Sequence, residues 1–295
     1  MKRIILYIIL LFPVYSISQT IDELLEDDMG NGENHESAAF KATRVIIGHS
    51  VEQMKAKHLD FRISHRFGKL NEGPYELFGL DQATIHLSLE YGLSDWLMAG
   101  VGRSNLHKTF DGFMKIKLLR QTAGTNKVPV FVNYVGSTEL NSARWANPDR
   151  ENLFSSRFTY VHQLLIARKF NSNLSLQLSP VLVHKNLVPA NRDANDLFAL
   201  GTSGRYKISN RVSINAEYFY AFRPENSSFN YPNALSVGVD IETGGHVFQI
   251  MLTNSLAMRE GGFIWGTDNG NWNDGGIHLG FNISRVFSLG QQNVY

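Results

Sequence analysis

The sequence contains no cysteine among its 295 residues. This absence excludes a lipid anchor on a cleavage-site cysteine, and it excludes disulfide bonds. After the first twenty residues there is also no run of roughly 18 uncharged apolar residues, the length that a membrane helix needs. A hydropathy scan would therefore classify the mature chain as soluble. Such a classification is unreliable for β-barrels, whose strands alternate apolar and polar residues and so average to neutral.

An excess of charge of one sign is also missing. The formal net charge is +1, and removal of Lys2 and Arg3 with a signal peptide would leave about −1. No overall basic bias therefore points to nucleic acid as a partner.

The N-terminus is typical of a secretory signal peptide. Two basic residues precede the apolar run from Ile4 to Val14, and Ser16 and Ser18 then supply the small-x-small pattern of a cleavage site. We expect a signal peptide of residues 1–18. The alternative, a single N-terminal membrane anchor, is disfavoured because the apolar run is too short and small residues follow it.

Two short segments precede the main part of the chain. Residues 19–39 are acidic and predict a flexible periplasmic leader. Residues 40–57 contain an apolar run and predict either a luminal plug or an extra strand. If Arg44 and His49 enter the lumen, they can meet acidic wall residues and close a channel. As an outer edge strand, the segment would leave the pore more open.

From residue 58 onward the hydrophobic pattern has a period of two. For example, Ile85, Leu87 and Leu89 alternate with His86 and Ser88. Such strands fit a half-buried soluble sheet or a barrel wall equally well. The candidate strands are 58–68, 82–91, 96–104, 111–120, 128–137, 155–170, 174–186, 198–208, 212–222, 234–242, 247–255 and 277–287.

The lengths of the connections separate these two architectures. The even-numbered connections are short, and the odd-numbered ones are mostly long, such as 138–154 and 256–276. Transmembrane barrels have short periplasmic turns and long outer loops. We therefore predict an all-β, antiparallel transmembrane β-barrel of about 12 strands over residues 58–288, with a short C-terminal tail at 289–295.

The distribution of charge and aromatic residues supports a membrane location. The predicted outward faces carry almost no charge in mid-strand, where Arg or Lys would cost about 2–4 kcal/mol. Exceptions such as Arg120 and Arg285 lie near strand ends, where they can reach the interface. Aromatic residues such as Trp96 and Phe287 also gather toward strand ends, as in interfacial girdles. We expect a bacterial outer-membrane protein in contact with lipid.

Several segments resemble a family of uncharacterised outer-membrane β-barrel proteins. The resemblance runs from about Phe40 to Phe287 and implies a signal-bearing antiparallel barrel. It brings no established catalytic residues, so none can be transferred. The matching segments are LDFRISHRFG at 59–68, FGLDQA at 78–83, EYGLSDWLMAGVGRS at 90–104, KLLRQ at 117–121, HQLLIARKF at 162–170, IETGGHVFQI at 241–250 and GFNISRVF at 280–287.

The predicted lumen face carries charges of both signs. They form either a conduit or binding site for small polar solutes, or pairs that brace a narrow and largely filled lumen. The polar residues predicted to face the lumen are Asp60, Arg62, Arg66, His86, Glu90, Lys115, Lys117, Glu217, Asp240 and Glu242.

Other chemistry has weaker support. The histidine spacings match no metal motif, so we predict no metal site, no cofactor and no catalytic residues. A surface lipid hydrolase would need His162 beside Ser284 or Ser156, and no motif places them together.

The outer loops hold aromatic residues among Asn, Asp and Gly, including Trp145, Trp265 and Trp272. They can grip sugars or partner proteins, or they can pack over the barrel mouth. The leading functional hypothesis is a channel or solute-binding barrel for small polar solutes. The alternative is a structural barrel with a sealed lumen that docks an envelope protein.

Overall fold

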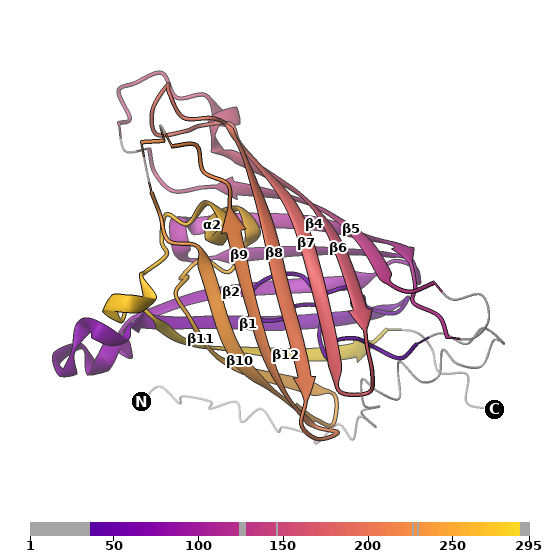
Figure 1. Cartoon of the computed structure of the whole chain (residues 1–295). Helices are drawn as coiled ribbons and strands as arrows, with labels where there is room; N and C mark the ends of the chain where they lie inside the picture. The colour runs from indigo at the N-terminus through magenta and orange to yellow at the C-terminus, as the bar shows by residue number, and fades with distance from the viewer. Residues whose placement is uncertain (1–35, 124–127, 146, 226, 229, 290–295) are drawn as a thin grey trace, which may run out of the picture.

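The computed structural model describes residues 36–123, 128–145, 147–225, 227–228 and 230–289. The expected signal peptide, the leader up to residue 35 and the tail from residue 290 lie outside these residues. The described part closes into a single antiparallel barrel of twelve strands, as Figure 1 shows. The strands are β1 (His58–Lys69), β2 (Ala83–Gly92), β3 (Leu97–Ser104), β4 (Thr109–Leu119), β5 (Phe131–Asn141), β6 (Phe158–Lys169), β7 (Leu174–Lys185), β8 (Asp196–Lys207), β9 (Val212–Ala221), β10 (Ala234–Thr243), β11 (His246–Thr253) and β12 (His278–Ser288).

Each strand pairs with its sequence neighbours, and β1 pairs with β12 to close the barrel. The predicted fold class and strand number are therefore confirmed. The largest difference in bounds concerns β5, which was predicted at 128–137. Val128 instead pairs with Thr122, because its N–H donates to the Thr122 hydroxyl and its carbonyl accepts from the Thr122 N–H. The strand begins later as a result and continues to Asn141.

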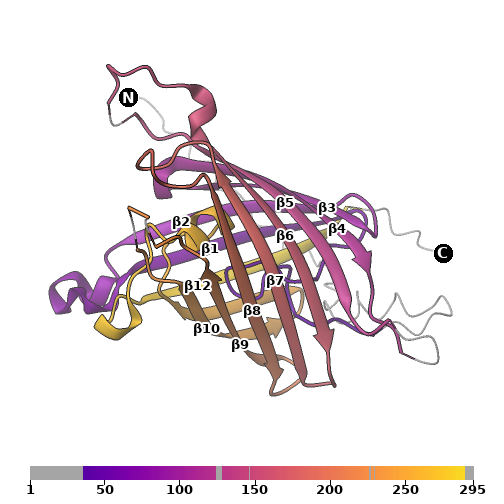
Figure 2. The same cartoon turned by 45° about the horizontal axis from the view of Figure 1, so that its top comes forward.

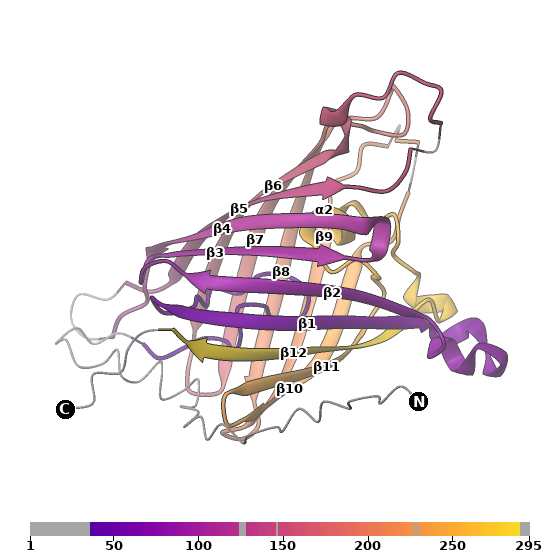
Figure 3. The ribbon, with the colours of Figure 1, turned by 180° about the vertical axis from the view of Figure 1, so that it is seen from behind.

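The two ends of the barrel differ in their connections, as Figure 3 shows from behind. One end has short turns, such as 170–173 and 208–211, and we call it the short-turn end. The other, the long-loop end, carries the short helices of the described residues. These are η2 (Leu70–Glu72), η3 (Pro74–Gly79), η4 (Leu106–Lys108), η5 (Phe154–Arg157), α2 (Glu260–Trp265) and η6 (Trp272–Asp274). Within the described residues, no helix has the length and apolar character needed to span a membrane.

The outer surface of the wall is apolar, and its few arginines lie near strand ends. Arg103, Arg168 and Arg285 each stack over a neighbouring aromatic ring at about 5.0 Å or less, which suits a cation at a membrane interface. Arg120, which was expected on this face, instead lines a cavity at the short-turn end. The register of β4 against β5 shifts between Lys117 and Leu119, just before this arginine.

The hydrophobic core lies inside the barrel. Residues 36–57, which we call the plug, run through the lumen together with helix α2 of the loop 254–277 (Figure 2). Phe40 and Ile46 of the plug are buried with the wall residues Phe113 and Phe219. The inward-facing aromatic side chains of the wall thus pack against apolar residues of the plug. In a water-filled pore the same side chains would be exposed to water.

Candidate functional site: a plugged polar lumen

The plug forms a tight hairpin rather than an extra strand. The Ser50 N–H donates to the Thr43 carbonyl at 3.0 Å, and the Val45 N–H donates to the Gly48 carbonyl at 2.9 Å. The Glu52 carboxylate accepts from a main-chain N–H of the first arm at 2.8 Å. An extra wall strand has no place to pair, because β1 and β12 already close the ladder. Residues 40–51, all buried except the partly buried Arg44, therefore lie in the lumen, and Ala56 already pairs with Gly92 at the end of β2.

The cations of the plug meet carboxylates of the wall. Lys41 pairs with Glu242 at 2.5 Å, and Arg44 pairs with Glu90 at 3.3 Å. Glu90 also accepts a 2.5 Å hydrogen bond from the hydroxyl of Thr43. All of these side chains are buried or nearly so, which makes the pairing necessary, because an unpaired buried charge is strongly destabilising.

The main chain of the plug is held by polar wall side chains. Glu217 accepts from the Ile47 N–H at 2.6 Å. Lys115 donates to the carbonyls of Thr43, Ser50 and Glu52 at 3.2, 3.0 and 2.9 Å. Further donors to plug carbonyls are Arg205 to Ala39, Gln249 to Val45, Asn282 to Ile46, Gln177 to His49 and Asn133 to Val51.

The remaining residues predicted to face the lumen divide into two groups. Asp60 lies beside the plug contacts, where it accepts from Ser284 at 2.5 Å and from Arg62 at 3.2 Å. Arg62 also donates to the Thr43 hydroxyl, so it belongs to the same network. Four others lie apart from the cation pairs: Arg66 bonds Asn282, Asp240 bonds Gln249, His86 bonds Asp111, and Lys117 lines the cavity at the short-turn end.

Helix α2 closes the lumen from the long-loop end. Glu260 lies 3.7 Å from His49 of the plug, and Phe263 packs on Phe219 with ring centroids 4.8 Å apart. Arg259 pairs with Glu139 of β5 at 2.6 Å, and this carboxylate also accepts from the Gly261 N–H. The plug and α2 therefore meet inside the lumen.

Burial changes the protonation of both groups at this junction. It raises the pKa of Glu260 to about 7, against the charge of Arg44, which lowers it, and Glu139 and Asp111 add to the rise. It lowers the pKa of His49 well below its ordinary value, and the charges of Arg44, Lys115 and Arg62 lower it further. Near neutral pH, His49 is uncharged and Glu260 is close to half protonated.

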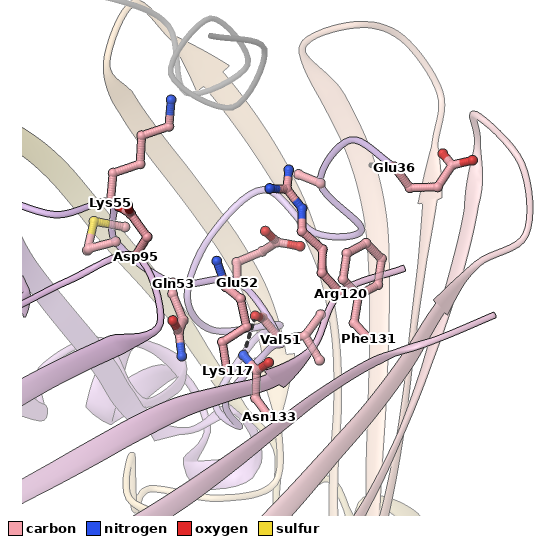
Figure 4. A pocket seen from close by; sticks show the side chains of 12 residues that line it. Glu36, Val51, Glu52, Gln53, Lys55, Asp95, Lys117, Arg120, Phe131 and Asn133 are labelled. Atoms are coloured by element: carbon pink, nitrogen blue, oxygen red, sulfur yellow. Dashed lines mark hydrogen bonds between the residues drawn. The ribbon is translucent and has the colours of Figure 1, made fainter. Parts of the chain in front are cut away.

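The lumen keeps a cavity at each end. A cavity of about 120 Å³ lies at the short-turn end, where Glu52, Lys55, Lys117 and Arg120 surround it (Figure 4). A cavity of about 250 Å³ lies at the long-loop end, between the wall and the loop that carries α2. The plug and α2 lie between these two spaces.

The loop aromatics have different environments. Trp265 is buried at the end of α2 and faces the Lys185 ammonium at 4.4 Å. Trp145 is half-buried, and the Arg157 guanidinium lies 3.8 Å from its ring. Trp272 lies in η6, which projects from the long-loop end. Trp265 is therefore the tryptophan of the three that packs into the mouth of the barrel.

Two features of the site were absent from the sequence predictions. Glu139 lies beyond the predicted end of its strand, and Arg259 and Glu260 lie in a loop that was expected outside. The apolar run Phe263-Ile264-Trp265 in that loop is the signal for an inward fold. Ser284 and His162 do not meet: Ser284 is in the lumen, whereas His162 is exposed on the outer face and bonds Tyr134 at 2.6 Å.

Comparisons with solved structures give porins and channels at low identity. The NanC porin has a TM-score of 0.48 and 10% identity, covering 77% of this chain and 98% of its own. The KdgM porin has a TM-score of 0.45 and 11% identity, covering 78% and 98%. The COG4313 outer membrane channel from Pseudomonas putida F1 has a TM-score of 0.46 and 13% identity, covering 80% and 97%.

No curated protein sequence matches the chain. A family model does match, over residues 40–287, and its span includes the plug from Phe40 together with all but the last residue of the wall. The chain therefore belongs to the family described as membrane bound beta barrel domain (DUF5777).

Proposed function

We propose that the protein is a gated outer-membrane barrel, which admits small polar solutes when the plug leaves the lumen. One observation carries this proposal: the plug fills a lumen whose wall is polar and charged, and it supplies the donors that the wall carboxylates Glu90, Glu217 and Glu242 need. In this proposal the short-turn end faces the periplasm and the long loops face the outside.

The buried charges favour a gate over a permanent seal. A barrel that stays closed gains little from buried ion pairs, because well-packed apolar side chains of similar volume are often as stable or more stable. In a barrel that opens, the charged side chains of the wall bind water in place of the plug and keep the pore hydrated. The lumen charges are therefore those expected of a conduit.

The connectivity also allows the movement. The plug precedes β1, so its withdrawal breaks none of the hydrogen bonds between wall strands. Its exit lies beside Gly92, where the Lys57 N–H donates to the Gly92 carbonyl at 2.9 Å. The proposal assigns no catalytic role to the barrel, and the separation of Ser284 from His162 agrees with that.

Conductance of the full chain in planar bilayers tests the proposal. The double variant Lys41→Ala/Arg44→Ala leaves Glu242 and Glu90 in the wall without their plug cations. Loss of one partner of a buried pair costs roughly 3–5 kcal/mol, and this cost disappears when the plug leaves and water reaches the carboxylates. We expect rare openings in the wild type and at least tenfold more frequent openings in the variant.

The matched control is Lys57→Ala, a charge removal at an exposed position of the plug. It should leave the frequency of openings unchanged. The competing function is a sealed barrel that docks an envelope protein, which the closed lumen also suits. Absence of conductance in the wild type and in the double variant, with both folded, would favour the sealed barrel and refute the gate.

A further inference from the structure

The cavity at the long-loop end, which we call the vestibule, is built from neighbouring wall positions and from the α2 loop. Glu139, Thr159 and Lys185 form one row across β5, β6 and β7, since each is the register partner of the next. Arg157 precedes β6, and Arg259 approaches from the α2 loop. The volume of about 250 Å³ suits a molecule the size of a six-carbon sugar.

The acidic groups of the vestibule already have partners. Glu139 accepts from the Arg259 guanidinium at 2.6 Å and from the Gly261 N–H at 2.8 Å. Asp268 at the rim pairs with His107 at 3.1 Å. These two carboxylates are the acidic side chains of the lining, and neither pairs with Lys185 or Arg157.

Two cations of the vestibule form no salt bridge with the described residues. The Lys185 ammonium lies 4.4 Å from the ring of Trp265, and its three donors make no hydrogen bond within the described part of the chain. The carboxylates of Glu139 and Asp268 attract it without reaching salt-bridge distance. The Arg157 guanidinium donates through Nη1 to the carbonyls of Asn141 and Ala143, both at 2.7 Å, and stacks on Trp145. Lys185, Arg157 and Arg259 thus oppose two carboxylates, an excess of positive charge.

We propose that the vestibule binds a small organic anion through its carboxylate or phosphate group, with Lys185 and Arg157 as the recognising cations. Lys185 gains the hydrogen bonds it lacks, and the guanidinium of Arg157 offers a planar set of donors that fits an oxyanion. The rings of Trp265 and Trp145 hold the two cations in place. This inference names the solute class of the proposed gated barrel and rests on that function for its physiological meaning.

Calorimetric titration of the refolded full-length protein tests the site with matched ligand pairs. Gluconate and sorbitol share a six-carbon polyol skeleton and differ at a carboxylate. Glucose 6-phosphate and glucose differ at a phosphate. We expect saturable binding of at least one anion, affinity for its neutral counterpart at least tenfold weaker, and an affinity that falls as salt is raised. Binding of gluconate alone assigns a carboxylate ligand, and binding of glucose 6-phosphate alone assigns a phosphate ligand.

Variants locate the binding in the vestibule. Lys185→Gln should weaken the anion at least tenfold, whereas Lys185→Arg should stay within about threefold of the wild type. The control Lys69→Gln makes the same change at an exposed lysine of the long-loop end, outside the vestibule, and should leave the affinity unchanged. Binding of neither anion, equal binding of a sugar and its anion, or equal losses in Lys185→Gln and Lys69→Gln would overturn the proposal.

The titration measures binding to the closed barrel, so its result does not depend on whether the barrel conducts. A barrel that binds the anion but never conducts would refute the gate and leave the vestibule site standing. A barrel that conducts but binds neither anion would refute the vestibule site and leave the gate standing.

Discussion

Glu260 is the residue at which the α2 loop and the plug meet, and its burial makes that junction sensitive to pH. Its pKa is about 7 when α2 is docked, against an ordinary value of 4.5 in water. A raised acid pKa means that the docked state binds the proton more tightly, so the docked state gains stability as pH falls through about 7. Burial lowers the pKa of His49, so His49 binds a proton more readily in the undocked state. As pH falls below the ordinary His49 pKa of 6.5, His49 therefore favours the undocked state and opposes the effect of Glu260.

Between about pH 8.5 and about pH 6.5 Glu260 favours the docked state by about fourfold, and His49 offsets about half of this, so we expect the fraction of time open to fall about twofold. Glu260→Gln should remove this fall, because its side chain stays neutral and only the opposing contribution of His49 remains. Bilayer recordings at these two pH values provide the measurement. An unchanged pH dependence in Glu260→Gln would show that another group controls it.

Gly92 is a second single position on which the plug depends. An added Cβ there would lie 1.9 Å from the Lys55 carbonyl oxygen, a main-chain atom that has little freedom to yield. Gly92→Ala should displace the exit of the plug and speed protease cleavage within residues 36–57 of the folded barrel roughly tenfold. Gly112→Ala is the control, since its Cβ would meet nothing closer than 3.7 Å. Equal cleavage rates in the two variants would contradict this account of the exit.

At the scale of the elements, α2 is held inside the barrel mainly by apolar contact. Phe263 is fully buried against Phe219. Phe263→Ala should lower the free energy of unfolding by about 3–5 kcal/mol, as measured by denaturant titration in detergent. Phe154→Ala, at an aromatic that is 64% exposed in another long loop, should change it by less than about 0.5 kcal/mol. Similar losses in both variants would mean that α2 is not docked in solution.

The sequence predicts some of these elements better than others, for physical reasons. The wall follows from the alternation of side chains and from the parity of loop lengths, because both reflect a closed ladder between two membrane surfaces. The position of residues 40–57 remained open, since the run Val45-Ile46-Ile47 fits a strand and a buried hairpin alike. Pairing of β1 with β12 decides it, and that is a long-range contact.

The inward fold of the α2 loop was not predicted. Its helix has only six residues, too short to give an amphipathic pattern, and its docking depends on Phe219 and Glu139 from distant strands. The sequence did not predict the grouping of the vestibule cations, because it also depends on contacts between segments far apart in the chain. Lys185 and Arg157 line the same cavity only when β6 and β7 are paired.

At the scale of the whole molecule, the wall and its contents have different roles. The ladder of twelve strands satisfies the main-chain groups of the wall and supplies the membrane-spanning structure. The plug and α2 supply the core, and they decide whether the lumen admits solutes. The central claim is that the wall can remain intact while its contents move.

Cysteine accessibility tests this claim most directly, because the natural chain has no cysteine. Ser88 of β2 is buried in the lumen between His86 and Glu90, so Ser88→Cys reports on the centre of the barrel. The rate of labelling by a charged, membrane-impermeant thiol reagent is measured in the natural background, in Lys41→Ala/Arg44→Ala and in Lys57→Ala. The gated barrel predicts slow labelling in the natural and Lys57→Ala backgrounds and labelling at least tenfold faster in the double variant. Equal rates in all three backgrounds, with the barrel folded in each, would contradict it.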